Sequence, residues 1–576
     1  MSRALPPARA TLGTALLTLL ASLPLDARQS VPLAASLAAT PASLAAESGE
    51  PPALCPGTAA SLTPQSGTPA CQAPTTPADN DVRVELKRIV FKGASAIPES
   101  ELQALVADSI GRSVSFGELR AIAERITQRY HDHGYLLAQA VLPVQEVQDG
   151  VVEISIVEGR LGRVLLEVDP SAPISEARVR RILHALQQGE PLNGPDYERA
   201  MLLLSDLPGL RVQSTLEAGI AAGTSDLTVQ VAPGDRLLGS VELDNYGSRE
   251  VGRERLGGTV RWASPLRLGD NLDVRALVSS DEGTVFGRIA YELPLGGNGL
   301  RVGGGVSRVS YQLGGEFEIL DAVGSARIVD LAMTYPVIRQ RGHNLFLRGF
   351  VDRKQLTDEL RAVQFQTEKR IEGVGLGWAW ERRDGFAGGG YFSSSGALYR
   401  GRLHLLDPAS LAVDQGPFGR DTAGGFTKLT VQASRLQAVT RRISLFAGLG
   451  AQFSDRNLDA SEKLTLGGHR AVRAYPSGEA LVDQGAIANL ELRYAVTPRL
   501  TAIAFHDVGS GKLLRHPGNL IADNTRTLRG AGVGLSYARP GQFSANLSVA
   551  WETSGAAVTD GGGRSPRVYL QLQKTF

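Results

Sequence analysis

Apolar and polar residues alternate along the C-terminal half of the chain with a period of two. Between residues 542 and 551, every second side chain is apolar: Phe543, Ala545, Leu547, Val549 and Trp551. The segment 443–454 repeats this pattern, and only Phe446 breaks it. Successive side chains of a strand point to opposite faces, so this period is typical of β-strands and not of helices.

These alternating segments predict an all-β transmembrane barrel over residues 235–576. About sixteen antiparallel strands fit between Leu237 and Phe576, an even number, as in single-chain bacterial barrels. Apolar side chains would face lipid and polar ones the lumen. In one segment Gly373, Gly375 and Gly377 share the polar face. The opposite face ends in Trp378 and Trp380, which are typical of the aromatic girdle at a membrane surface.

Two copies of a smaller pattern precede the barrel. Residues 81–159 read as one strand over 82–91, helices over 99–110 and 116–133, and strands over 136–142 and 151–157. The same order returns within residues 160–234. An internal repeat of about 75 residues indicates two related modules. The order of elements predicts that each module is an α+β sheet with helices on one face.

The first 80 residues differ in composition from the rest. Residues 1–27 combine two arginines with the apolar run 10–25, as expected of a secretory signal peptide. Residues 28–80 are rich in Ala, Pro, Ser and Thr, which predicts a low-complexity leader or a plug for the barrel. Cys55 and Cys71 are the only cysteines, and an exported chain favours a disulfide between them.

Charge and motifs exclude several classes of function. The net charge is +1 without a basic stripe, so no nucleic-acid partner is indicated. His131 and His133 are two residues apart on a helix and face different directions, so no metal site is predicted. The chain carries no nucleophile elbow and no phosphate-binding loop with its lysine. We therefore expect neither an enzyme nor a cofactor.

Several motifs resemble the two-partner secretion (type Vb) outer-membrane transporters, or TpsB proteins, also described as haemolysin secretion or activation proteins. The resemblance covers roughly residues 82–576. It lies in the motifs HGY at 133–135, VLPVQ at 141–145, VEG at 157–159, LLLSDLPG at 202–209 and DNYGS at 244–248. It implies two polypeptide-transport-associated (POTRA) domains, at 81–159 and 160–234. The candidate partner-binding residues in these domains are Gln145, Gly150, Gly159, Pro208 and Gly209, and Phe576 is the candidate C-terminal signal for barrel insertion.

Two further segments are similar to motifs of the barrel-assembly superfamily. The stretch 468–476 (GHRAVRAYP) resembles the V-R-G-Y-P tip of an inward-folding loop, and 505–509 (FHDVG) resembles an F-x-D-x-G strand motif. Ala474 stands where the superfamily has glycine after the arginine. Alanine would be strained there if the position requires a positive φ.

The residues themselves predict where these two motifs meet. Phe505, Asp507 and Gly509 share one strand face, and a carboxylate facing lipid is unfavourable by up to ~2–4 kcal/mol, so Asp507 should face the lumen. The connection between the strands near 454 and 486 is about 30 residues long, and connections of that length are commonly functional. If it folds inward, Arg473 and Tyr475 arrive at the wall, and Arg473 can pair with Asp507 or with Glu491. The alternative is an extracellular loop with a solvated arginine.

The resemblance implies a translocator that recognises an unfolded partner through its POTRA domains and exports it through the barrel. The partner would be a secreted protein with an N-terminal secretion domain, adhesin- or haemolysin-like and β-helical, encoded in the adjacent gene. Outer-membrane lipid, periplasmic chaperones and the barrel-assembly machinery are further expected partners. An outer-membrane assembly or insertion factor is the main alternative. A porin would leave the two modules without a role.

Overall fold

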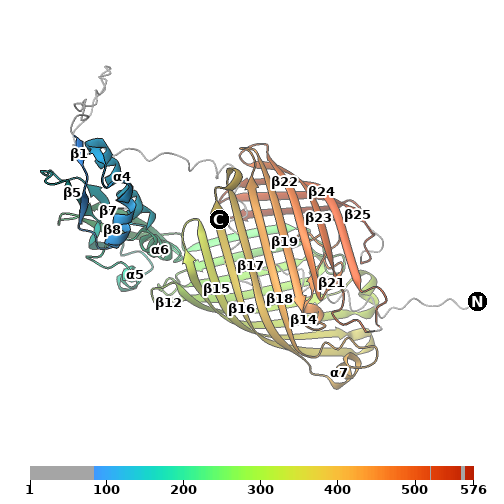
Figure 1. Ribbon diagram of the computed structural model, residues 1–576. Coiled ribbons are helices and arrows are strands. Elements are labelled where there is room, and N and C mark those ends of the chain that lie inside the picture. Colours follow the sequence, from blue (N-terminus) through green and yellow to red (C-terminus); the bar gives the residue numbers. More distant parts are fainter. Residues whose placement is uncertain (1–82, 136, 519, 560–564) are drawn as a thin grey trace, which may run out of the picture.

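The computed structural model describes residues 83–135, 137–518, 520–559 and 565–576. Two small α+β modules lie at one end of a large barrel (Figure 1). This arrangement confirms the fold class expected from the sequence. The predicted signal peptide, the leader and the pair Cys55 and Cys71 lie outside the described residues.

The first module contains two sheets and two main helices. Its elements are β1 (Arg83–Glu85), β2 (Arg88–Lys92), α3 (Glu99–Val106), η3 (Ala107–Ser109), β3 (Ser113–Ser115), α4 (Phe116–Asp132), β4 (Gln139–Val141) and β5 (Val151–Val157). The order of the main sheet is β2-β5-β4, with β2 parallel to β5, and β1 pairs separately with β3. Helix α4 begins at a capping box, in which Ser115 and Glu118 each accept a hydrogen bond from the other's backbone.

The single strand predicted over 82–91 is wrong, because the chain forms two strands there. Leu86 and Ile89 are both fully buried although they are three residues apart. In one continuous strand they would lie on opposite faces, so the chain bends between them. Leu86 bonds to the backbone of Arg112, and the next amide, of Lys87, bonds to Gly150 instead. The spacing of the two apolar residues could have revealed this bend.

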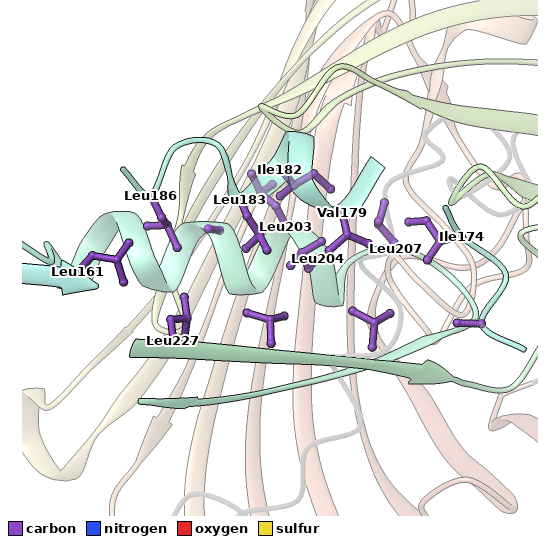
Figure 2. Close-up of a cluster of buried hydrophobic side chains, with 14 of the residues drawn as sticks. Leu161, Ile174, Val179, Ile182, Leu183, Leu186, Leu203, Leu204, Leu207 and Leu227 are labelled. Atoms are coloured by element: carbon purple, nitrogen blue, oxygen red, sulfur yellow. The ribbon is translucent and has the colours of Figure 1, made fainter. Parts of the chain in front are cut away.

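The second module has one three-stranded sheet covered by two helices. Its elements are β6 (Arg160–Val168), α5 (Glu176–Leu183), α6 (Gly194–Ser205), β7 (Leu210–Ala218) and β8 (Thr224–Pro233), and the sheet order is β6-β8-β7. Figure 2 shows Val179 and Leu183 of α5 and Leu204 of α6 gathered above the sheet that carries Leu227. This apolar layer is the core of the module.

Sixteen antiparallel strands close the barrel. They are β9 (Leu237–Asp244), β10 (Arg255–Ala263), β11 (Asn271–Ser279), β12 (Thr284–Leu295), β13 (Leu300–Gln312), β14 (Ala322–Arg339), β15 (His343–Leu360), β16 (Phe365–Asp384), β17 (Gly390–Leu405), β18 (Gly424–Ala438), β19 (Ile443–Ser454), β22 (Gln484–Ala495), β23 (Leu500–Lys512), β24 (Thr525–Arg539), β25 (Phe543–Ser554) and β26 (Arg567–Thr575). The connections carry α7 (Pro408–Asp414), β20 (Leu464–Thr465), β21 (Leu481–Val482) and five short 3-10 turns, η4 (Ser280–Glu282), η5 (Gly315–Leu320), η6 (Arg361–Val363), η7 (Phe386–Gly388) and η8 (Ala460–Glu462).

The two faces of the barrel wall follow the predicted alternation. Val374 and Leu376 of β16 are more than half exposed on the outward face, where lipid would cover them. Farther along the same face, the Trp380 ring meets the Phe392 ring of β17 edge to face, with centroids 5.2 Å apart. On the inward face, a Cβ on Gly373 would lie 2.2 Å from the Tyr399 hydroxyl oxygen. That glycine makes room for an aromatic ring in the lumen.

In the described ranges, no helix is both long and apolar enough to cross a membrane.

The seam between the first and last strands of the barrel is short. Strand β26 pairs with β9 over five residues, whereas β15 and β16 pair over eighteen. Phe576 extends the seam, because its backbone exchanges hydrogen bonds of 2.9 and 3.0 Å with Gly239. The Phe576 ring covers Gly239 so closely that a Cβ there would lie 2.4 Å from it.

The second module is fastened to the turns at one end of the barrel. The Asp206 carboxylate accepts hydrogen bonds from Nε and NH2 of Arg339 at 2.8 and 2.6 Å, which form a bidentate pair beside the β14–β15 turn. The Ser264 hydroxyl donates to the Pro208 carbonyl at 2.7 Å. These contacts mark the turns after β10 and β14 as the module end of the barrel.

We predict that Gly159→Ala destabilises the first module much more than Gly189→Ala destabilises the second module. Both glycines have a positive φ, but a Cβ on Gly159 would lie 2.4 Å from the Leu137 Cβ, and one on Gly189 would meet nothing within 4 Å. We expect a loss in unfolding free energy of about 3 kcal/mol for Gly159→Ala and about 1 kcal/mol for Gly189→Ala. Hydrogen exchange in the intact chain measures both, and equal losses would contradict the close approach.

Candidate functional site

The connection between β19 and β22, residues 455–483, folds into the barrel. Leu466, Val472 and Tyr475 in this inserted loop are fully buried, and β20 pairs with β21 to form its stem. The buried loop residues pack in one apolar cluster with Phe505 and Leu528 of the barrel wall. The loop therefore has its own core against the inner surface of the barrel.

Arg473 holds the tip of the loop to the wall. Its Nε and NH2 donate to the two oxygens of Asp507 at 2.8 and 2.7 Å, and its NH1 donates to Glu491 at 2.7 Å. The guanidinium also lies 3.5 Å above the centre of the Phe505 ring. The sequence left Asp507 and Glu491 as competing partners, and in the structure Arg473 contacts both.

This cluster satisfies its charges internally. The side chains of Asp507 and Glu491 are 0% and 8% exposed, and that of Arg473 is 13% exposed. Arg493 forms a second ion pair with Glu491 at 2.7 Å, so two arginines face two carboxylates. Asn489 donates to Asp507 at 2.8 Å and to the Ala471 carbonyl at 2.9 Å. A buried set of charges with complete partners is strongly destabilised when one member is removed.

Tyr475 and Gly509 complete the contact between loop and wall. The Tyr475 hydroxyl donates to the carbonyls of Ser554 and Gly555, and the Tyr475 carbonyl accepts from the Tyr569 hydroxyl at 2.9 Å. A Cβ on Gly509 would lie 3.0 Å from the Val472 side chain. Glycine at that position lets the loop approach the strand closely.

The strain considered for Ala474 does not arise. Ala474 is not among the residues with positive φ, so alanine is compatible with its backbone. Its Cβ lies 2.5 Å from the position that a Cβ on Gly530 would occupy. The close approach of loop and wall therefore requires glycine on the strand, at Gly530, and not at position 474 of the loop.

A second group of ion pairs, which the sequence analysis missed, holds the arm of the loop between β19 and the tip. The fully buried Glu462 forms ion pairs with Lys354 of β15 at 2.6 Å and with Lys428 of β18 at 2.5 Å. Asp459 pairs with Lys369 of β16 at 3.1 Å. All three lysines stand at inward positions in the period-two alternation of their strands, which is the signal that could have found them. The loop thus reaches two different parts of the wall.

Aromatic rings join the loop to the barrel seam. The His469 ring stacks on the Tyr246 ring with centroids 3.7 Å apart, and Tyr246 meets Tyr569 edge to face at 5.8 Å. Tyr246 follows β9 and Tyr569 lies in β26, so the rings lie where the first and last strands meet. The Ser477 hydroxyl also donates to the Tyr246 carbonyl at 2.9 Å.

The structure does not bring the candidate partner-binding residues into one site. The Gln145 amide exchanges hydrogen bonds of 2.8 and 2.7 Å with the Glu153 backbone, so it occupies groups of β5 that lie beyond the end of β4. Gly150 and Gly159 have positive φ at the ends of β5, and Pro208 and Gly209 lie at the junction with the barrel. Their role in partner binding stays a prediction.

Metal-binding side chains do not cluster in the described parts of the chain, where no group of three or more His, Cys, Asp or Glu could hold an ion.

A closed barrel with an inward-folded loop and POTRA-like modules at one end defines an outer-membrane translocator of the POTRA–barrel class. Residues 223–537 match the family of haemolysin secretion/activation proteins ShlB/FhaC/HecB, and residues 84–159 match a POTRA domain of ShlB type. The chain belongs to this family. It is an outer-membrane transporter of two-partner secretion, with its POTRA domains in the periplasm.

Relatives agree with this assignment, and a solved structure has the same fold. The chain is 27% identical over 473 residues to the heme/hemopexin transporter protein HuxB of Haemophilus influenzae, covering 80% of this chain and 82% of that protein. It is 25% identical to the outer membrane transporter CdiB of Escherichia coli, covering 81% and 79%. The structure of CdiB from Escherichia coli has the same fold, with a TM-score of 0.70, 24% identity and coverage of 88% of this chain and 93% of that one.

Proposed function

We propose that this transporter exports one large secreted protein that carries an N-terminal secretion domain and is encoded in the adjacent gene. The family assignment carries this proposal, because its members are transporters of partner proteins. The cargo in this proposal is an adhesin- or haemolysin-like protein with a β-helical fold. One relative is named a hemolysin transporter, which supports the haemolysin-like class. Periplasmic chaperones and the barrel-assembly machinery, which would read Phe576, serve the insertion of the transporter itself.

Deleting the gene tests this assignment against the alternative of an assembly factor. We expect one large protein to disappear from the cell surface or medium while other outer-membrane proteins keep their levels. Comparative proteomics of the outer membrane and of the medium measures both. A broad loss of outer-membrane barrels would instead support an assembly or insertion role.

The cargo would first bind to an open strand edge in the periplasm. Among the described residues, β7 pairs with β8 alone, and its nine residues alternate between exposed and half-buried positions for most of their length. An unfolded chain can add to such an edge through backbone hydrogen bonds. In the first module, Gln145 already occupies backbone groups of β5 in a similar way.

A photo-crosslinker at Gln213 of β7 tests this binding site. We expect it to capture the unfolded secretion domain of the neighbouring exported protein, because Gln213 is exposed on the open strand. The same crosslinker at Glu176, which begins α5 on the other side of the module, serves as the matched control. Adducts from Glu176 alone, or equal yields from both positions, would contradict binding along β7.

The inserted loop would hold the pore closed until cargo arrives. Arg473, Asp507 and Glu491 at the tip, with Phe505, Tyr475 and Gly509 around them, form the latch in this proposal. Supporting it, the loop contacts the wall both at its tip, through Arg473, and on the arm that precedes the tip, through Glu462. Passage of a chain through the lumen requires these contacts to change.

A further inference from the structure

Arginines gather on the outward face of the barrel, at the end away from the modules. Arg308 of β13 lies directly opposite Arg327 of β14, and Arg327 lies opposite Gln355 of β15. Gln355 in turn lies opposite Arg370 of β16. These four residues form one row across four neighbouring strands, which we call the arginine row.

The arginine row faces outward. Arg327 alternates in phase with Val329 and Leu331, which are exposed on the outward face of β14. Arg308 is likewise in phase with the exposed Val306 of β13. Arg308 and Arg327 are themselves exposed. Side chains two residues apart on a strand share a face, so both arginines point away from the lumen.

The height of the arginine row matches the outer boundary of the apolar band. Arg339 and the β14–β15 turn contact the second module, so that end of β14 is periplasmic. Tyr335 marks the aromatic boundary there, and Arg327 lies eight residues farther along the strand. With a strand rise of about 3.3 Å per residue and a tilt of about 40°, this separation is roughly 20 Å along the barrel axis. Arg327 therefore lies near the headgroups of the outer leaflet.

In the described residues, the charges of Arg308 and Arg327 are not balanced by a carboxylate partner. Like charges directly opposite each other on a sheet are destabilising. Within the described residues, neither Arg308 nor Arg327 makes a side-chain hydrogen bond or ion pair. Glu372 forms ion pairs with both Arg353 and Arg370, at 3.6 Å each. The Arg370 Nε is shielded from solvent yet makes no hydrogen bond in the described chain.

We propose that the arginine row binds the phosphate groups of a phosphorylated lipid headgroup in the outer leaflet. Guanidinium groups match phosphate oxygens in bidentate geometry, and an anion between Arg308 and Arg327 removes their repulsion. The row borders apolar, lipid-facing positions. This favours a lipid whose phosphorylated headgroup lies at the row and whose acyl chains lie against Val306, Val329 and Leu331. This site does not depend on the proposed cargo or on the inserted loop.

Binding of a defined lipid to the full-length chain in neutral detergent tests the proposal. The probe is a six-chain diglucosamine lipid with two phosphates, compared with the same lipid after removal of both phosphates and with inorganic phosphate. We expect Arg308→Gln and Arg327→Gln each to weaken binding of the phosphorylated lipid about fivefold, and the double variant about 30-fold. Native mass spectrometry measures the bound fraction.

The controls separate this site from general effects. Arg382→Gln removes an outward arginine at the periplasmic end of β16 and is expected to leave the affinity unchanged. Heat-modifiable gel migration shows which variants retain a folded barrel. Equal binding of the dephosphorylated lipid, or an unchanged affinity in a folded double variant, would overturn the proposal. So would inorganic phosphate that competes at the same concentration as the lipid, because it would indicate an unspecific anion site.

Discussion

Replacing Arg473 with alanine is expected to release the tip of the inserted loop from the barrel wall. The substitution leaves Asp507, which is fully buried, without its bidentate partner. Breaking a buried pair in this way costs about 3–5 kcal/mol. A cysteine in place of Ser477, which is 7% exposed, reports the release. We expect slow labelling by an impermeant maleimide in the parent chain and rapid labelling in the Arg473→Ala background.

A double-mutant cycle separates the pair from its surroundings. If Arg473 and Asp507 act together, the double alanine variant should label no faster than either single variant. Arg493→Ala is the matched control, because Arg493 also binds Glu491 in the lumen and its guanidinium lies over the Phe446 ring of β19, which belongs to the barrel wall. Strictly additive effects of Arg473→Ala and Asp507→Ala would reject their direct coupling.

The second large effect is expected at Glu158 in the first module. This carboxylate is 4% exposed and accepts hydrogen bonds from the Ala96 amide at 2.7 Å and from the Tyr130 hydroxyl at 3.1 Å, besides two from Ser95. Glu158→Ala leaves the buried Tyr130 hydroxyl and the amides of Ser95 and Ala96 without this acceptor. We expect a loss of about 3 kcal/mol in the stability of the module, measured by hydrogen exchange in α4 of the intact chain.

The same carboxylate makes the first module sensitive to acid. Burial raises the pKa of Glu158, and the hydrogen bonds from Ser95, Ala96 and Tyr130 lower it by more, so that the pKa lies below its ordinary value. A carboxyl group with a lowered folded-state pKa stabilises the fold above its unfolded-state pKa of about 4.5, and this contribution disappears as the pH falls through the folded-state value. Protection of α4, corrected for intrinsic exchange, should therefore fall below about pH 4.5.

Glu158→Gln should flatten this pH dependence, because an amide does not titrate in this range. Glu124→Gln, on the exposed face of α4, is the matched control and should keep the full dependence. If Glu158→Gln and the parent chain lose protection over the same pH range, other carboxylates are responsible.

The barrel could be predicted from the sequence because its rule is local. Each strand must present an apolar residue to the lipid at every second position. The pattern around Val374 and Leu376 therefore predicts both the strand and which of its faces points outward. The inward position of Asp507 follows in the same way, since a charge facing lipid is unfavourable. With the strand faces fixed, the resemblance of the loop tip was enough to suggest that Arg473 and Asp507 meet.

Contacts that depend on which walls face each other could not be predicted in this way. The alternation is compatible with Lys354 and Lys428 in the lumen, but only the closed barrel shows that both reach Glu462. The contact of Gln145 with Glu153 depends on β4 ending early, at Val141. Arg308 and Arg327 become neighbours only through the register of β13 and β14, which no local pattern determines.

The stacked rings at the barrel seam couple the position of the inserted loop to the packing between the first and last strands. His469 travels with the loop, and its ring rests on Tyr246 beside the five residue pairs that join the first strand to the last. A loop that withdraws to clear a path for cargo must take this ring with it. Withdrawal of the loop would therefore remove packing from the shortest strand pairing of the barrel, so opening of the channel and loosening of the seam would be coupled.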